Sequence, residues 1–279
     1  MTTADFDQLA DEELVSDLTD GVLRLTINRA AKGNSIPWYV RDRLMTHFLA
    51  AHTNLAVRCV VLTAVGERHF CTGADLTVAH PMVERPEGAP DRPVGVAADM
   101  MRRGFERLME TILDCQKPVI VALNGTAAGG GSMLTLAADL VIAADSARII
   151  QVFVRRGLVP DGGVTYLLPR LVGMHKAKEL MFFGDDLSAA DAERLGIVNK
   201  VVAGADLAAA TDEWAQRLAN GPTKAIGWSK QLLNLAFDVP RAQHLETEAL
   251  LVETNGGTFD STEGVAAFRE RREPEWQGW

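Results

Sequence analysis

The spacing of hydrophobic and polar side chains changes along the chain and predicts a succession of strands and helices. Residues 22–27 (VLRLTI) alternate apolar and polar side chains, which is typical of a strand. Residues 58–65 (RCVVLTAV) and 118–123 (PVIVAL) are nearly continuous apolar runs, as expected for strands buried on both faces beneath helices. Residues 37–51 and 98–114 have helical spacing. Repeated strand–helix units of this kind predict an α/β core.

The last third of the chain has a different pattern. From residue 189 onward helical spacing prevails, except at residues 197–202, and glycine or proline interrupts it several times. We therefore expect a core of residues 1–203 and a smaller helical unit of residues 204–279. Residues 83–95 are rich in proline, glycine and charge and are predicted to form a loop.

Charge and cysteine content narrow the range of functions. The 279 residues carry a formal net charge of −9, which argues against a nucleic-acid partner because phosphate binding needs a basic surface. Three cysteines at irregular spacing, without a CxxC pair, predict neither disulfides nor a metal site. The acidic N-terminus is unlike a signal peptide, and the apolar stretches are too short to span a bilayer. We expect a cytoplasmic protein without a membrane partner.

Small residues follow two of the predicted strands, at residues 70–76 (FCTGADL) and 124–131 (NGTAAGGG). Three consecutive glycines at a helix start expose unpaired N–H groups at the positive end of the helix dipole. Such groups suit a phosphate or a developing oxyanion. Tight packing of the helix against the sheet explains the same glycines equally well. The motifs GxxxxGK[ST], GxGxxG and GxSxG are absent, so the usual nucleotide loops and nucleophile elbow are not predicted.

These two segments, continued by residues 132–145 (SMLTLAADLVIAAD), resemble the paired signature of the crotonase (enoyl-CoA hydratase/isomerase) superfamily. Further similarity lies in NR at 28–29, GLVPDGG at 157–163, GIVNKVV at 196–202 and AFRERREPEW at 267–276. The likeness spans about residues 20–276 in the family's order. It is specific for the family and does not specify the reaction.

The resemblance implies a spiral of ββα units with a C-terminal helical trimerisation domain, assembled as a homotrimer or homohexamer. It implies an acyl-CoA substrate and no cofactor beyond the coenzyme A moiety of that substrate. The backbone N–H groups of Ala74 and Gly130 match the pair that forms the family's oxyanion hole around the thioester carbonyl.

The resemblance also implies where coenzyme A binds. Its path would run over Arg29, Lys32, Ala74, Asp75 and Leu76. Arg271 matches a basic residue of the closing helix that reaches the coenzyme's phosphates, sometimes from a neighbouring subunit. Most lysines and arginines are simply solvated surface groups, so the roles of Lys32 and Arg271 depend on the family match.

The chain departs from the hydratase pattern at two positions. Where hydratases carry two glutamates, it has Met133 and Phe153, which cannot exchange protons and are expected to line the substrate pocket. Asp161, in VPDGG, matches a position at which several relatives use an aspartate as base or nucleophile. An apolar pocket would disfavour the charged carboxylate of Asp161 and raise its pKa. Pro-Asp-Gly is also an ordinary turn sequence.

The sequence therefore predicts an enzyme that moves a proton on an acyl-CoA. Asp161 would remove an α- or γ-proton and return it elsewhere, while Ala74 and Gly130 hold the enolate. Two other possibilities stay open. One is a hydratase with non-standard residues, and the other is a non-catalytic acyl-CoA-binding pseudoenzyme. Glu106 and Asp99 are candidates for a second carboxylate at the site. The acyl group is not specified.

Overall fold

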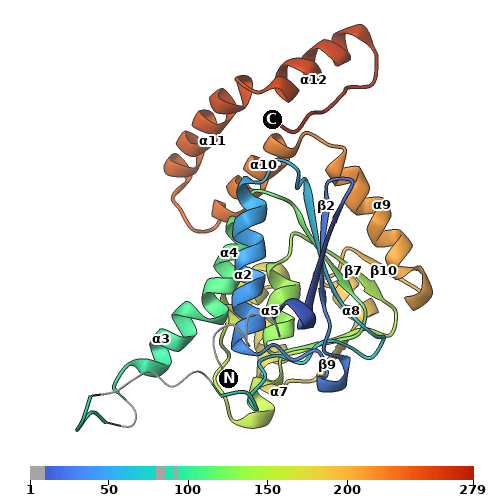
Figure 1. The fold of residues 1–279 in the computed structure, drawn as a ribbon. Coiled ribbons are helices and arrows are strands. Elements are labelled where there is room, and N and C mark those ends of the chain that lie inside the picture. Colours follow the sequence, from blue (N-terminus) through green and yellow to red (C-terminus); the bar gives the residue numbers. More distant parts are fainter. Residues whose placement is uncertain (1–9, 80–85, 91–92) are drawn as a thin grey trace.

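Two β-sheets organise the chain in the computed structural model, which describes residues 10–79, 86–90 and 93–279. The larger sheet has the strand order β1-β2-β3-β5-β7-β10, and the smaller has the order β4-β6-β8-β9. Helices lie on both sides of the larger sheet, with α9 opposite α2, α4 and α5 (Figure 1). The predicted loop at 83–95 lies partly outside the described residues.

The predicted buried strands belong to the larger sheet. Its members are β1 (Leu14–Thr19), β2 (Val22–Ile27), β3 (Cys59–Ala64), β5 (Val119–Leu123), β7 (Leu140–Ala144) and β10 (Lys200–Val202). All neighbours pair in parallel except β1 and β2. Every side chain of β5 and nearly every one of β3 is buried, as a parallel sheet covered by helices requires. The strands predicted at 22–27, 58–65 and 118–123 are thus confirmed.

Strand β1 does not show in the hydrophobic pattern. Only its first residue, Leu14, is buried, while Val15 and Leu18 are exposed, because β1 is an edge strand with one neighbour. It joins β2 through Asp20 and Gly21, which both have positive φ (49° and 79°). Asp-Gly is a turn signal for a two-residue hairpin, so this dipeptide could have revealed the strand.

The smaller sheet alternates with the larger one along the chain. It contains β4 (His69–Cys71), β6 (Thr126–Ala128), β8 (Arg148–Ile150) and β9 (Asp186–Ser188). The chain runs through β3 and β4 to α3 (Val96–Arg103), through β5 and β6 to α5 (Gly130–Ala137), and through β7 and β8 to α6 (Val164–Val172). This succession is the spiral of ββα units implied by the resemblance, and that prediction is confirmed.

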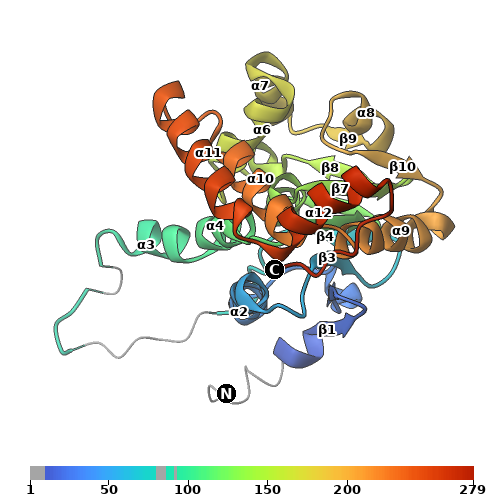
Figure 2. The same ribbon diagram turned by 90° about the horizontal axis from the view of Figure 1, so that it is seen from above.

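The helix predicted over 98–114 is divided in two. Helix α3 ends at Arg103, and α4 (Phe105–Asp114) begins after Gly104, whose φ and ψ are −98° and −117°. A side chain at Gly104 would overlap the Met100 carbonyl and lie 2.9 Å from the Arg41 guanidinium. Hydrophobic spacing continues across the break, so only tertiary packing reveals it. Helix α3 lies at the edge of the molecule (Figures 1 and 2).

The remaining helices complete the core and the C-terminal region. They are α2 (Trp38–Thr53), α7 (Met174–Phe183), α8 (Ala189–Arg194), α9 (Leu207–Ala219), α10 (Thr223–Leu235), α11 (Arg241–Gly256) and α12 (Phe259–Glu270), with 3-10 segments η1 (Ala30–Lys32), η2 (Val152–Arg156) and η3 (Gly204–Asp206). None of the helices in the described ranges is long and apolar enough to cross a membrane.

The C-terminal helices differ in how they meet the core. Helix α9 packs on β3, β5 and β7 and buries Leu207 and Ala215. Helix α11 buries no residue, and α11 and α12 lie beyond the end of the sheet (Figure 1). The first helix of the predicted unit 204–279 therefore covers the core sheet, and the division of the chain at residue 203 stays a prediction.

Candidate active site

Two glycine turns bring backbone N–H groups together beside the smaller sheet. Gly73 (φ 103°) follows β4, and Gly129 (φ 54°) precedes α5, and both conformations favour glycine. A Cβ at Gly73 would lie 3.2 Å from the nitrogen of Gly130, so the two turns almost touch. Within the described residues, the N–H groups of Ala74 and Gly130 donate to no protein acceptor. Both are available to a ligand.

Packing also demands small residues at the start of α5. A Cβ at Gly131 would overlap the carbonyl of Cys71, and one at Gly130 would lie 2.7 Å from the Phe105 ring. Helix packing and ligand approach therefore impose the same requirement on neighbouring positions. This is why the glycine run alone could not separate the two explanations.

Ala74 and Gly130 line a cavity of about 350 Å³, called here the glycine cavity. Its wall is mostly apolar, with contributions from Trp38, Leu76, Met100, Met101, Phe105, Phe153 and Leu158. Its charged residues are Arg41, Asp75, Arg156 and Asp161. Several of these, such as Trp38 and Met100, were not predicted from the sequence, because they come from α2 and α3 and carry no local motif.

Asp161 lies in the turn between η2 and α6. Although the residue as a whole is exposed, partial burial of its carboxyl raises its pKa, and the negative charge of Glu106 raises it further. Its carboxylate accepts no hydrogen bond and forms no ion pair in the part of the chain that the structure describes. Asparagines and aspartates that shape turns hydrogen-bond the local backbone, so the turn does not account for this carboxylate.

Phe153 and Met133 are placed differently. Phe153 is 6% exposed and lines the glycine cavity. Met133 is fully buried and is absent from the cavity wall. It lies beneath the turn, where a Cβ at Gly162 would be 3.5 Å from its Cγ. Met133 therefore supports the turn that carries Asp161, and the expectation that it lines the pocket does not fit this placement.

The Arg29 side chain is turned into the protein. It is 8% exposed, and its guanidinium contacts Asp75 at 2.9 Å and Glu13 at 2.7 Å. Burial opposes ionisation of Asp75, but hydrogen bonds from Thr77 and Arg29 outweigh it and lower the pKa to about 2. The predicted contact of Arg29 with coenzyme A does not fit this geometry, because the side chain is buried and holds the 74–76 segment through its ion pair with Asp75.

Lys32, Leu76 and Arg271 are exposed, as coenzyme-binding residues should be. Leu76 is 78% exposed and lines the glycine cavity. Lys32 ends η1, and Arg271 is the C-cap of α12 in a left-handed conformation (φ 55°). Helix α12 lies at the opposite end of the molecule from α3, which lines the cavity through Met100 (Figure 1). One chain does not bring Arg271 to its own cavity, and its contact from a neighbouring subunit stays a prediction.

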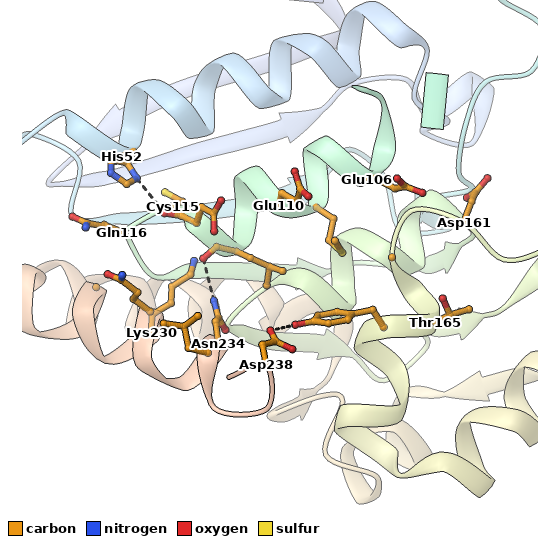
Figure 3. Close-up of a pocket in the computed structure, with 18 of the residues that line it drawn as sticks. His52, Glu106, Glu110, Cys115, Gln116, Asp161, Thr165, Lys230, Asn234 and Asp238 are labelled. Carbon is orange, nitrogen blue, oxygen red and sulfur yellow. Dashed lines mark hydrogen bonds between the residues drawn. The ribbon is translucent and has the colours of Figure 1, made fainter. Parts of the chain in front are cut away.

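A second hollow of about 720 Å³, the α4 groove, lies between α4, α10 and the turn that leads into α6 (Figure 3). Most of the residues that line it are polar or charged, including Glu106, Glu110, Asp114, Thr165, Lys230, Asn234 and Asp238. Among the residues that the structure describes, Asp161 is the one that lines both the groove and the glycine cavity. It therefore stands where the two meet.

The structure separates the two candidates for a second carboxylate. Glu106, in the first turn of α4, lines the α4 groove together with Asp161 (Figure 3). Asp99 belongs to α3, faces solvent with 61% of its side chain exposed and lines neither hollow. Of these two carboxylates, Glu106 is the one that lies in the same groove as Asp161.

Comparison with known proteins agrees with this fold. The enoyl-CoA hydratase/isomerase family matches residues 17–279. The chain is 36% identical to 1,2-epoxyphenylacetyl-CoA isomerase of Escherichia coli (strain K12), over 96% of this chain and 99% of that protein. It is 35% identical to a probable enoyl-CoA hydratase of Rhodobacter capsulatus, over 94% and 96%. The structure of a putative enoyl-CoA hydratase from Streptomyces coelicolor A3(2) superposes with a TM-score of 0.86 at 33% identity, covering 96% of this chain and 94% of that one.

The chain belongs to the enoyl-CoA hydratase/isomerase family. It is an acyl-CoA enzyme of the crotonase fold, as the sequence motifs predicted. Its relatives are named both isomerase and hydratase, so membership alone does not distinguish between the two reactions.

Proposed function

We propose that the protein is an isomerase that shifts a proton along the acyl chain of an acyl-CoA, with Asp161 as the base. One observation carries the proposal: a carboxylate with a raised pKa lines the same cavity as two unpaired backbone N–H groups. A raised carboxylate pKa in a cleft is typical of a catalytic base. A relative that is 36% identical is named as an acyl-CoA isomerase, which supports the same choice.

In the proposed reaction the thioester oxygen accepts hydrogen bonds from the N–H groups of Ala74 and Gly130. Asp161 takes an α- or γ-proton, and the electron pair of the broken C–H bond moves toward the thioester oxygen to form the enolate. The protonated Asp161 then returns the proton to another carbon, and the double bond moves. Nothing is gained or lost overall. Each oxyanion donor typically lowers the barrier by about 3–4 kcal/mol.

Coenzyme A would lie over η1 and the 74–76 segment, where Lys32 and Leu76 are exposed. Arg29 would contribute indirectly, by holding Asp75 in this segment. In a homotrimer or homohexamer, Arg271 of a neighbouring chain would meet the phosphates. We also propose that the protein is located in the cytoplasm.

The proposal is tested by incubating enoyl-CoA esters of different chain lengths with the protein in D₂O. Mass spectrometry reports deuterium uptake and the added mass of water, and chromatography reports the position of the double bond. Uptake with double-bond migration supports the isomerase. Water addition as the main reaction would indicate a hydratase, and tight binding without either change would indicate a pseudoenzyme.

We predict that hydration of crotonyl-CoA is slow, because Met133 and Phe153 replace the paired glutamates and a positioned acid or base contributes about 10²–10⁴-fold. Loss of the enoyl absorbance measures the reaction. Deuterium exchange in the same sample is the internal control for active protein. Hydration as fast as that exchange would mean that Glu106 and Asp161 activate water together.

We predict that Lys32→Ala weakens binding of acetyl-CoA about 3–10-fold at low salt, because an exposed ion pair contributes about 1 kcal/mol. The difference should shrink as salt screens the phosphates. Calorimetric titration measures it, with Lys178→Ala on α7 as the control, since Lys178 is exposed and absent from the wall of the glycine cavity, and its helix packs on α6 and η2. Equal affinity of wild type and Lys32→Ala would remove Lys32 from the site.

A further inference from the structure

Helix α4 presents one face to the α4 groove. Its groove-lining residues are Glu106, Met109, Glu110, Leu113 and Asp114, and this i, i+3, i+4, i+7, i+8 spacing puts them on a single side of the helix. Glu106 comes first, at the end nearest the turn that carries Asp161 (Figure 3). The helix therefore directs Glu106 to the place where groove and glycine cavity meet.

Packing fixes the start of α4 against both parts of the site. The Phe105 ring lies 2.7 Å from the position of a Cβ at Gly130, and the Phe105 Cβ lies 3.5 Å from that of Gly162. One turn later, Met109 fills the space that a side chain at Gly163 would need. Glu106 is held between these two contacts, so its backbone has little freedom to move away from Asp161.

The other charges around Asp161 are mostly neutralised by partners of their own. On the groove side, Glu110 pairs with Arg107 at 3.1 Å, and Lys230 pairs with Asp139 at 2.9 Å. Asp238 pairs with Arg170 at 2.7 Å and also accepts a hydrogen bond from the hydroxyl of Tyr166. At the far end of the groove, His52 Nδ1 lies 3.1 Å from the backbone oxygen of Asp114.

On the cavity side, Arg41 pairs with Asp42 at 2.7 Å and Asp75 pairs with Arg29 at 2.9 Å. Arg156 is the remaining charged residue of the cavity wall besides Asp161, and it forms no ion pair among the described residues. Within the described ranges, Glu106 has no ion-pair partner. Its charge is therefore uncompensated beside Asp161. Of all these groups, Glu106 is the one whose charge raises the pKa of Asp161, after burial.

From this geometry we infer that Glu106 is a positioning residue that makes Asp161 a stronger base by placing a second negative charge beside it. The inference rests on the proposed function, since it concerns the base of that reaction. Glu106 exchanges no proton with the substrate. When Asp161 accepts the substrate proton, the repulsion between the two carboxylates disappears, which favours the proton transfer.

The experiment compares the pH dependence of kcat/KM for deuterium exchange in wild type, Glu106→Gln, Glu106→Asp and Glu110→Gln. Because the base must be ionised, the acid limb of the profile reports its pKa. Removing the charge in Glu106→Gln lowers that pKa, so the acid limb should move to lower pH and the plateau should fall. Glu106→Asp keeps the charge, so its acid limb should lie close to the pH of the wild-type limb. Glu110→Gln, on the same helix face, should behave as wild type.

Two outcomes separate this inference from the proposed function. If Asp161→Asn abolishes exchange but the acid limb of Glu106→Gln stays at the wild-type pH, Asp161 is the base and Glu106 does not tune it. If Asp161→Asn keeps full exchange activity, Asp161 is not the base, and the proposed function itself is wrong. A loss of activity in Glu106→Gln without a shift of the limb would mark a structural role and also overturn the inference.

Discussion

Replacing Asp161 by asparagine is expected to slow proton exchange on an acyl-CoA substrate by about 10²–10⁴-fold, because a positioned base typically contributes that much. Asparagine keeps the size of the side chain and its tolerance of turns. The carboxylate of Asp161 has no hydrogen bond or ion pair among the described residues. The free energy of unfolding should therefore change little. Mass spectrometry in D₂O measures the exchange, and thermal unfolding measures the stability.

Asp185→Asn is a suitable control for Asp161→Asn. Asp185 is an exposed aspartate that follows Gly184, the C-cap of α7. It lines neither the glycine cavity nor the α4 groove. It should leave exchange unchanged. Full exchange activity in Asp161→Asn would show that Asp161 is only a turn residue and would move the base to another acid, with Glu106 the first to test. Loss of exchange together with unfolding would require repetition with Asp161→Glu, which should retain part of the activity.

The second large effect is expected at Gly130. Gly130→Pro removes the backbone N–H proposed to hold the thioester oxygen, and loss of one oxyanion donor typically costs about 10²–10³-fold in kcat. Proline is tolerated at the first residue of a helix, and Gly130 is the first residue of α5. The variant therefore removes the donor at a position where the helix can still begin.

Gly130→Ala is the matched control, because both substitutions add a Cβ that would lie 2.7 Å from the Phe105 ring. Any loss in Gly130→Ala measures this steric effect with the N–H retained. The further loss in Gly130→Pro then measures the donor, together with the restriction that proline places on Gly129. Single-turnover kinetics with a saturating acyl-CoA separate chemistry from binding. Equal rates for the two variants would remove Gly130 from the oxyanion hole.

The asymmetry between the two variants follows from where each group comes from. In the proposed mechanism Asp161 acts through its side chain, so a substitution can remove the carboxylate at little structural cost. Gly130 would act through its backbone N–H, and its neighbours Gly129 and Gly131 are needed for conformation and packing. Substitutions at Gly131, where a Cβ would overlap the Cys71 carbonyl, would disturb the fold and say nothing about catalysis.

The sequence by itself determined the main buried strands and the family, and the resemblance to that family implied the ββα order. Strands β3 and β5 are apolar throughout because both faces are buried, and such local patterns can be recognised without coordinates. The glycines of the two turns and the loss of the paired glutamates were equally visible, because each depends on residue type at a fixed spacing. Asp161 was identified in the same way, from its place in VPDGG.

The tertiary structure alone decided which side chains meet. Glu106 and Asp161 are 55 positions apart by their residue numbers, yet they line one groove, while Asp99, on the preceding helix, points to solvent. The break at Gly104, which separates Asp99 from Glu106, falls where a side chain would meet the Met100 carbonyl and the Arg41 guanidinium. The buried ion pairs of Arg29 and the position of Met133 beneath Gly162 also depend on residues distant in sequence. Contacts of this kind follow from how elements pack, and hydrophobic periodicity reports only which face of each element is buried.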